Sequence, residues 1–73
     1  MNNNEKYSIV TNAVRKIVGN KDIDEEKNLL EFMGPLDAVY VLTFIEREAN
    51  VDFTNKFTNN PDVLSVNGLM RLL

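Results

Sequence analysis

The chain contains no cysteine and no histidine, so neither a disulfide nor a metal bound by these side chains can hold it together. Its 73 residues must therefore fold through side-chain packing. A chain of this length buries only about 60% of the surface that it exposes when unfolded, which allows one small core. We expect residues 1–73 to form a single domain in which residues 1–4 are disordered.

The same two absences argue against catalysis. Histidine is the commonest general base and the commonest metal ligand, and a core this small cannot enclose a substrate. The acidic run at residues 22–26 could suggest paired catalytic carboxylates. A run of charges is more commonly a solvated surface. We therefore predict that the chain is not an enzyme.

Charge and hydropathy bear on partners and location. Eleven acidic residues outnumber eight basic ones, for a formal net charge of −3, and an acidic chain is repelled by phosphate backbones. No apolar run approaches the roughly 20 residues of a membrane-spanning helix. Residues 1–6 lack the basic-then-apolar order of a signal peptide. We expect no nucleic-acid partner, no membrane association and a cytoplasmic location.

Residues 5–18 have the spacing of an amphipathic helix. Asn4 is a candidate N-cap, and Gly19 can adopt the left-handed conformation that ends a helix. The apolar residues recur on one face of a 3.6-residue period: Ile9, Val10, Ala13, Val14, Ile17 and Val18. The pattern predicts a first long helix with this face in the core.

Residues 20–34 follow no clean period and predict a long loop anchored by single apolar side chains. Loops of this length are usually functional or partly helical. The segment superficially matches a calcium loop, with ligand types at Asn20, Asp22, Asp24 and Glu31. Glu25 stands where such a loop needs glycine for its sharp turn, so we predict no metal site. A calcium-responsive helical module stays an alternative that a calcium titration would test.

Gly34-Pro35 opens a second helix, which we expect to run from Pro35 to about Ala49. Proline suits the first helical position because it loses no hydrogen bond there and its φ is already helical. Asn50 is a suitable left-handed stop. The helix is apolar nearly all round: Leu36, Ala38, Val39, Val41, Leu42, Phe44 and Ile45. Such a helix is either central to a core or presents a second apolar surface to a partner.

The remaining residues predict an irregular segment and a weaker last helix. We expect extended coil at residues 51–53 and one short turn of helix around Phe57, within residues 54–60. Ser65 is a good N-cap, and Gly68 inside the last helix costs about 1 kcal/mol relative to alanine. The apolar face of that helix would comprise Val66, Leu69, Met70 and Leu73.

This order of elements resembles an acyl carrier protein. Two stretches carry the resemblance, at the interval the family has: Gly34-Pro35-Leu36-Asp37-Ala38-Val39 and Glu46-Arg47-Glu48-Ala49-Asn50-Val51-Asp52-Phe53. In the family the first reads Asp-Ser-Leu-Asp, then a small residue and valine. The second reads as a run of glutamates, an aromatic, and an acidic residue between two aliphatic or β-branched ones. The resemblance implies an all-α bundle of three main helices plus one short helix. Its core would include Ile9, Ala13, Val14, Ile17, Phe32, Leu42, Ile45, Phe53, Val66 and Leu69.

Pro35 stands where the family has its functional serine. The family's serine hydroxyl forms a phosphodiester with 4′-phosphopantetheine, whose thiol carries the acyl chain. Proline has no nucleophile, and it has no N–H to favour a phosphate at a helix N-terminus. Tyr40 carries the next hydroxyl along this helix, and Thr43 lies about 12 Å of helix rise away. We therefore expect no cofactor to be attached at residue 35.

The resemblance also implies docking, because carrier proteins meet basic patches on their enzymes through acidic residues of this helix. At helical spacing the corresponding face here consists of Leu36, Val39, Tyr40, Thr43, Glu46 and Arg47. Tyr40 falls where the family usually has glutamate, and Arg47 interrupts the acidic run. The acidic signal is weakened, and an aromatic residue of the kind that anchors interfaces replaces it. In an alternative interpretation, the Tyr40 ring only covers the neighbouring helix.

Two functional hypotheses follow. In the first, the chain is a monomeric carrier-like module that cannot be loaded. It would serve as a docking or scaffold protein for an enzyme of fatty-acid, polyketide or peptide biosynthesis. In the second, it is a genuine acyl carrier protein whose attachment serine was lost by mutation or by an engineered change.

Overall fold

A computed structural model describes residues 1–53 and 64–73 of the chain. Within these residues the elements are α1 (Asn3–Val18), the 3-10 helix η1 (Leu29–Glu31), α2 (Pro35–Ala49) and α3 (Val66–Leu72), and there is no strand. The all-α class and the three main helices are therefore confirmed for the described part. The short helix expected around Phe57 lies outside the described residues. The only other helical element among them is η1, inside the loop between α1 and α2.

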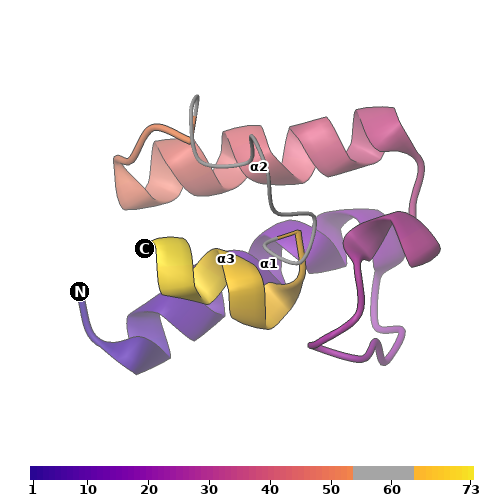
Figure 1. The fold of residues 1–73 in the computed structure, drawn as a ribbon, viewed down its shortest axis with the longest axis horizontal. Coiled ribbons are helices and arrows are strands. Elements are labelled where there is room, and N and C mark those ends of the chain that lie inside the picture. The colour runs from indigo at the N-terminus through magenta and orange to yellow at the C-terminus, as the bar shows by residue number, and fades with distance from the viewer. Residues whose placement is uncertain (54–63) are drawn as a thin grey trace.

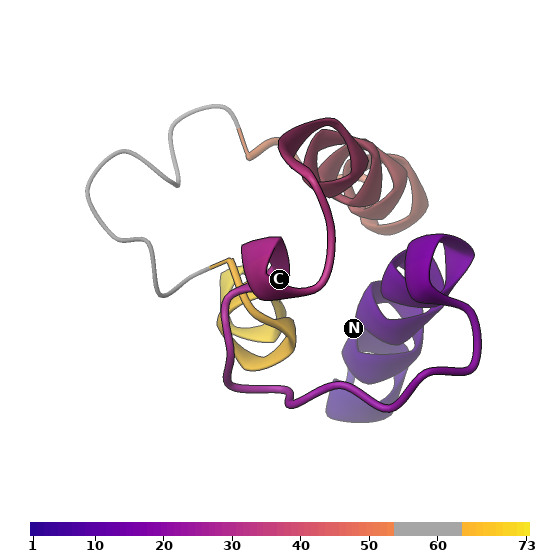
Figure 2. The same cartoon turned by 90° about the vertical axis from the view of Figure 1, so that its right-hand side faces the viewer.

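The three α-helices surround a common core. Helix α1 contacts both α2 and α3, and η1 contacts α2. Figure 1 shows α2 lying across the molecule above α1, with α3 in front of α1. Viewed from the side, η1 and α3 lie next to each other, across the core from α1 and α2 (Figure 2). A cation–π contact also joins the two long helices, because the Nζ atom of the exposed Lys16 lies 4.8 Å from the centroid of the Phe44 ring.

Helix α1 begins earlier than the sequence predicts. The N-cap is Asn2 and not Asn4, because the side-chain oxygen of Asn2 accepts a hydrogen bond from the N–H of Glu5 over 2.8 Å. The residues expected to be disordered therefore include the N-cap and the first two helical residues. The predicted end is confirmed: Gly19 has φ 69°, and its N–H donates to the carbonyl of Arg15.

Helix α2 has the predicted bounds, and each end has a local cause. Pro35 is the first helical residue and follows Gly34, whose backbone is extended at φ −75° and ψ 169°. Asn50 adopts the left-handed conformation at φ 55° and ψ 48°, and its N–H donates to the carbonyl of Glu46. In α3 the predicted cap is confirmed as well, since the Ser65 hydroxyl accepts from the N–H of Gly68 over 3.0 Å.

The core agrees with the prediction in its helical part and differs in the loop. Six predicted core residues are buried: Ala13, Val14, Ile45, Phe53, Val66 and Leu69. Ile9, Ile17 and Leu42 are half-buried and pack against the core's edge. The prediction of Phe32 as a core residue is wrong, because η1 turns Leu29 and Met33 inward and leaves Phe32 half-buried. Val10, Ala38 and Val41 are also buried. Each lies on the side of its helix that faces the core.

The loop between α1 and α2 is attached to α3 through its main chain. The N–H of Leu29 donates to the carbonyl of Leu64 over 2.8 Å, and the N–H of Asn67 donates to the carbonyl of Glu25 over 3.0 Å. The Leu29 side chain is fully buried. These contacts hold the loop between the first and last helices, so it is an ordered part of the fold.

Candidate functional site

Pro35 occupies the exposed N-terminal end of α2. Its pyrrolidine ring supplies no hydroxyl and no N–H at this position. The preceding residue, Gly34, is also exposed, and a Cβ atom added to it would meet no atom within 4 Å. A larger residue would therefore fit at position 34, so the glycine is not required there by packing.

Five of the six residues predicted for docking are solvent-exposed on α2. Leu36 is 86% exposed, Val39 58% and Tyr40 49%, and Thr43 and Arg47 are exposed as well. They lie opposite the residues that α2 buries, because steps of three and four residues follow one side of an α-helix. We call these five residues the α2 outer face: Leu36, Val39, Tyr40, Thr43 and Arg47.

The sixth residue, Glu46, has an internal role instead. It is half-buried, and its carboxylate accepts a hydrogen bond from the N–H of Phe53 over 2.8 Å. The reversal at Asn50 brings the chain back toward α2 and makes this contact possible. Glu46 therefore holds the segment that follows α2 against the helix. Helix spacing alone does not distinguish Glu46 from the exposed residues of the outer face. The Thr43 hydroxyl likewise has a partner within the helix, the carbonyl of Val39 at 2.9 Å.

The acidic loop does not gather its carboxylates into a cluster. Asp24 accepts a hydrogen bond from the N–H of Glu26 over 2.9 Å, and Glu25 accepts one from the hydroxyl of Tyr7. Among residues 1–53 and 64–73, no group of three or more histidine, cysteine or acidic side chains is placed to hold a metal ion.

The contact between Tyr7 and Glu25 is not predicted by the sequence pattern. The hydrogen bond and the negative charge of Glu25 both raise the pKa of Tyr7 above that of an ordinary tyrosine. The main-chain carbonyl of Glu25 binds Asn67, so Glu25 joins α1, the loop and α3. Eighteen residues separate Tyr7 from Glu25, and no periodic pattern indicates a contact at that distance along the chain.

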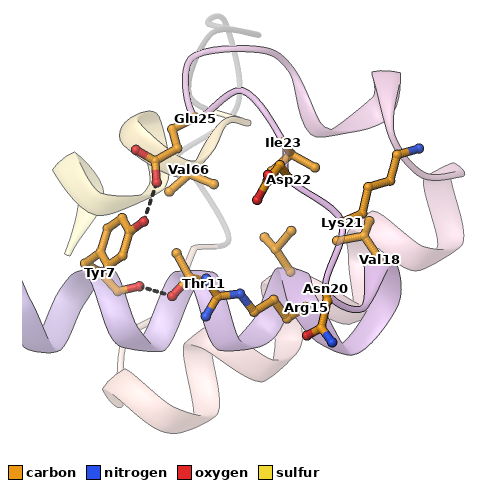
Figure 3. A pocket seen from close by; sticks show the side chains of 11 residues that line it. Tyr7, Thr11, Arg15, Val18, Asn20, Lys21, Asp22, Ile23, Glu25 and Val66 are labelled. Atoms are coloured by element: carbon orange, nitrogen blue, oxygen red, sulfur yellow. Dashed lines mark hydrogen bonds between the residues drawn. The ribbon is translucent and has the colours of Figure 1, made fainter.

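A hollow of about 230 Å³ lies beside this contact, between α1, the loop and the start of α3 (Figure 3). Apolar side chains that line it come from all three segments: Val14, Val18, Ile23 and Val66. Its charged lining residues are Arg15, Lys21, Asp22 and Glu25. The buried Thr11 also lines it, with its hydroxyl donating to the carbonyl of Tyr7 over 2.7 Å.

Comparisons of the chain with protein-family models, with curated proteins and with solved structures find no match. The resemblance to acyl carrier proteins therefore rests on the two stretches around Pro35 and Glu46 and on the order of the helices. Over residues 1–53 and 64–73, no helix combines the length and the apolar character that crossing a bilayer requires.

Proposed function

We propose that the chain is a carrier-like docking module that bears no prosthetic group and serves an enzyme of fatty-acid, polyketide or peptide biosynthesis. The observation that carries the proposal is the combination found at the start of α2. There, Pro35 at the first helical position is followed by the exposed side chains of Leu36, Val39 and Tyr40. Proline removes the covalent chemistry of the family, while its neighbours offer a surface for recognition.

The exposure of these side chains is the energetic argument for a partner. Full burial of a leucine or valine side chain contributes about 1.5–3 kcal/mol. Leu36 is 86% exposed and Val39 58%, so most of this stabilisation is absent in the isolated chain. Tyrosine is enriched among the residues that dominate binding energy. Single exposed apolar residues need no explanation, but three within one turn and a half of helix form a patch. A partner that covers this patch recovers the burial energy.

The charge of the face bears on the kind of partner. Glu46, one of the acidic positions in the family's docking helix, binds the N–H of Phe53. Arg47 is exposed on the same face. The α2 outer face is therefore apolar with one cation, and we expect its recognition to depend on the apolar contacts more than on charge.

The second candidate is a genuine carrier that has lost its serine. The space around Gly34 favours it, because the family's aspartate would meet no atom within 4 Å of its Cβ. Restoring both residues of the family's motif should then restore a site that a modifying enzyme can use. Both candidates have the same fold. They differ in whether the chain is a docking module that works without a prosthetic group or a carrier that has lost its attachment serine.

The modification test uses a promiscuous phosphopantetheinyl transferase with coenzyme A, followed by intact mass measurement. The parent protein should keep its mass, because Pro35 has no hydroxyl. A gain of one phosphopantetheine group by the double variant Gly34→Asp, Pro35→Ser would favour the second candidate, a genuine carrier that has lost its serine. A gain on the parent would contradict the unloaded module. If neither protein gains mass, the relation to the carrier family loses its support.

The docking test places a photo-crosslinking amino acid at Tyr40 in cells that produce the protein. The matched control carries it at Asn12, which is also exposed but lies on α1. We expect the probe at residue 40, and not at residue 12, to crosslink to one biosynthetic enzyme, and Leu36→Glu to abolish the product. Equal labelling from both positions would count against docking through α2.

A further inference from the structure

The exposed side chains of α2 form a line whose spacing is the same in both directions of the helix. Steps of four, three and four residues connect its members: Leu36, Tyr40, Thr43 and Arg47. Such steps follow one side of an α-helix, and all four side chains are exposed. When the helix is reversed, Leu36 comes to the level of Arg47 and Tyr40 to the level of Thr43. The line can therefore pack against an antiparallel copy of itself, as a twofold interface requires.

The two ends of this line carry opposite charges. Asp37 lies in the first turn of α2 and Arg47 in the last turn, and both are exposed. Side chains of one helix meet when they are three or four residues apart, so these two cannot bind each other within one chain. In the antiparallel arrangement, Arg47 of each copy comes to the end of α2 at which the other copy has Asp37. The face is therefore complementary in charge to a second copy of itself.

We propose that two copies of this chain associate through antiparallel α2 helices related by a twofold axis. Leu36 of each copy contacts the aliphatic stem of Arg47 in the other copy, and Tyr40 contacts Thr43. The guanidinium of Arg47 binds the carboxylate of Asp37. Each contact occurs twice, because the axis exchanges the two copies. A reversible dimer thus replaces the monomer that the sequence alone predicts.

The paired surface is small, so the dimer is weak. From Leu36 to Arg47 the helix rises about 17 Å, and one helix face of this length contributes less than the roughly 800 Å² per partner of a standard interface. We expect a dissociation constant on the order of 100 µM. At low concentration the chain is then monomeric, and its α2 outer face is accessible to another protein. Self-association and docking through this face exclude each other.

The test is sedimentation equilibrium of the purified protein over a range of about 10 µM to 1 mM, which brackets the expected dissociation constant. The mass should rise with concentration from that of the 8.3 kDa chain toward twice that value. Amide chemical shifts of the ¹⁵N-labelled protein should change over the same range at residues 36–47, and stay constant at Asn12 on the exposed side of α1. A mass that stays at the monomer value would overturn the proposal, as would shifts confined to residues outside α2.

Charge variants test the antiparallel arrangement. Arg47→Asp should weaken the dimer at least about tenfold, because it places two carboxylates at each end of the interface. The double variant Asp37→Arg, Arg47→Asp exchanges the charges and should restore the dimer. The matched control Glu48→Gln removes an exposed charge next to Arg47 and should not weaken association. A double variant as weak as Arg47→Asp would overturn the antiparallel pairing.

The dimer and the proposed function can fail separately. Sedimentation and chemical shifts are measured on the unmodified, purified protein without an enzyme, so the dimer does not rest on the proposed function. In the crosslinking experiment at Tyr40, a product of twice the chain's mass belongs to the dimer, and a larger one to the enzyme. The dilution series also holds if a charge variant fails to fold.

Discussion

The phenol of Tyr7 on α1 donates a hydrogen bond of 2.5 Å to the carboxylate of Glu25 in the loop. Of the side-chain hydrogen bonds described here, this one joins residues far apart in the sequence, whereas the helix caps join near neighbours. It closes one end of the hollow and lies next to the main-chain bond between Glu25 and Asn67. The contact therefore connects the first helix, the loop and the last helix, and it depends on the protonation of Tyr7.

The first prediction concerns pH. The hydrogen bond to Glu25, followed by the charge of Glu25, raises the pKa of Tyr7 in the folded protein. The stabilisation is therefore fully present below the unfolded tyrosine pKa of about 10, and it is lost as pH rises through the folded pKa. The chain has two tyrosines, so Tyr40→Phe leaves Tyr7 as the only chromophore that ionises to tyrosinate. Its ultraviolet titration midpoint should lie above 10.

A second change on the same background serves as the control. Glu25→Gln removes the carboxylate charge that raises the pKa of Tyr7, so the midpoint should move down toward the ordinary tyrosine value. An unchanged midpoint would show that the hydrogen bond is not formed in solution.

The second prediction concerns the loop. Leu29 and Leu30 are neighbours in η1, but Leu29 is 0% exposed and Leu30 is 48% exposed. Leu29→Ala should cost about 2–5 kcal/mol of unfolding free energy, because it leaves a cavity in the core. Leu30→Ala should stay within about 0.5 kcal/mol of the parent. Urea denaturation followed by circular dichroism measures both, and similar losses would place the loop outside the core.

The third prediction concerns Glu46. Its carboxylate binds the N–H of Phe53, whereas Glu48, two residues further along, is exposed. Glu46→Ala should destabilise the protein by about 1–3 kcal/mol, because a hydrogen bond to a charged group is lost. Glu48→Ala should change the unfolding free energy by less than about 0.5 kcal/mol. If the two variants unfold alike, Glu46 belongs to the docking face, as helix spacing predicts.

The fourth prediction concerns the caps of the first and last helices. Ser65 is 3% exposed, and its hydroxyl accepts the N–H of Gly68. Ser65→Ala should cost about 1–2 kcal/mol, at the upper end of measured cap losses, because the cap is buried. Asn2→Ala removes an exposed cap and should cost about 0.5–1 kcal/mol. Thermal or urea unfolding measures both losses of unfolding free energy. A larger loss for Asn2→Ala than for Ser65→Ala would contradict the prediction.

The helix ends that the sequence predicts correctly each have a local cause. Pro35 and Asn50 set the ends of α2 by backbone preference, and Gly19 and Ser65 mark the end of α1 and the start of α3 in the same way. The start of α1 was harder to predict, because Asn2, Asn3 and Asn4 are all able to cap.

Contacts between distant segments could not be predicted in this way. Phe32 is the larger side chain, but the 3-10 turn buries Leu29 and Met33 on either side of it. Helix spacing predicts the five residues of the α2 outer face, but it also assigns Glu46 to that face, which the structure binds to Phe53. The Tyr7–Glu25 contact and the hollow depend on how the loop lies against α1 and α3, which no single segment encodes.

The main-chain bond from Asn67 to Glu25 has a consequence for how the molecule opens. If α3 lifts away, the loop loses that bond and the hollow loses Val66 from its wall in the same event. The amides of Leu29 and Asn67, each bonded between the loop and the C-terminal segment, should therefore exchange their hydrogens with solvent at matching rates.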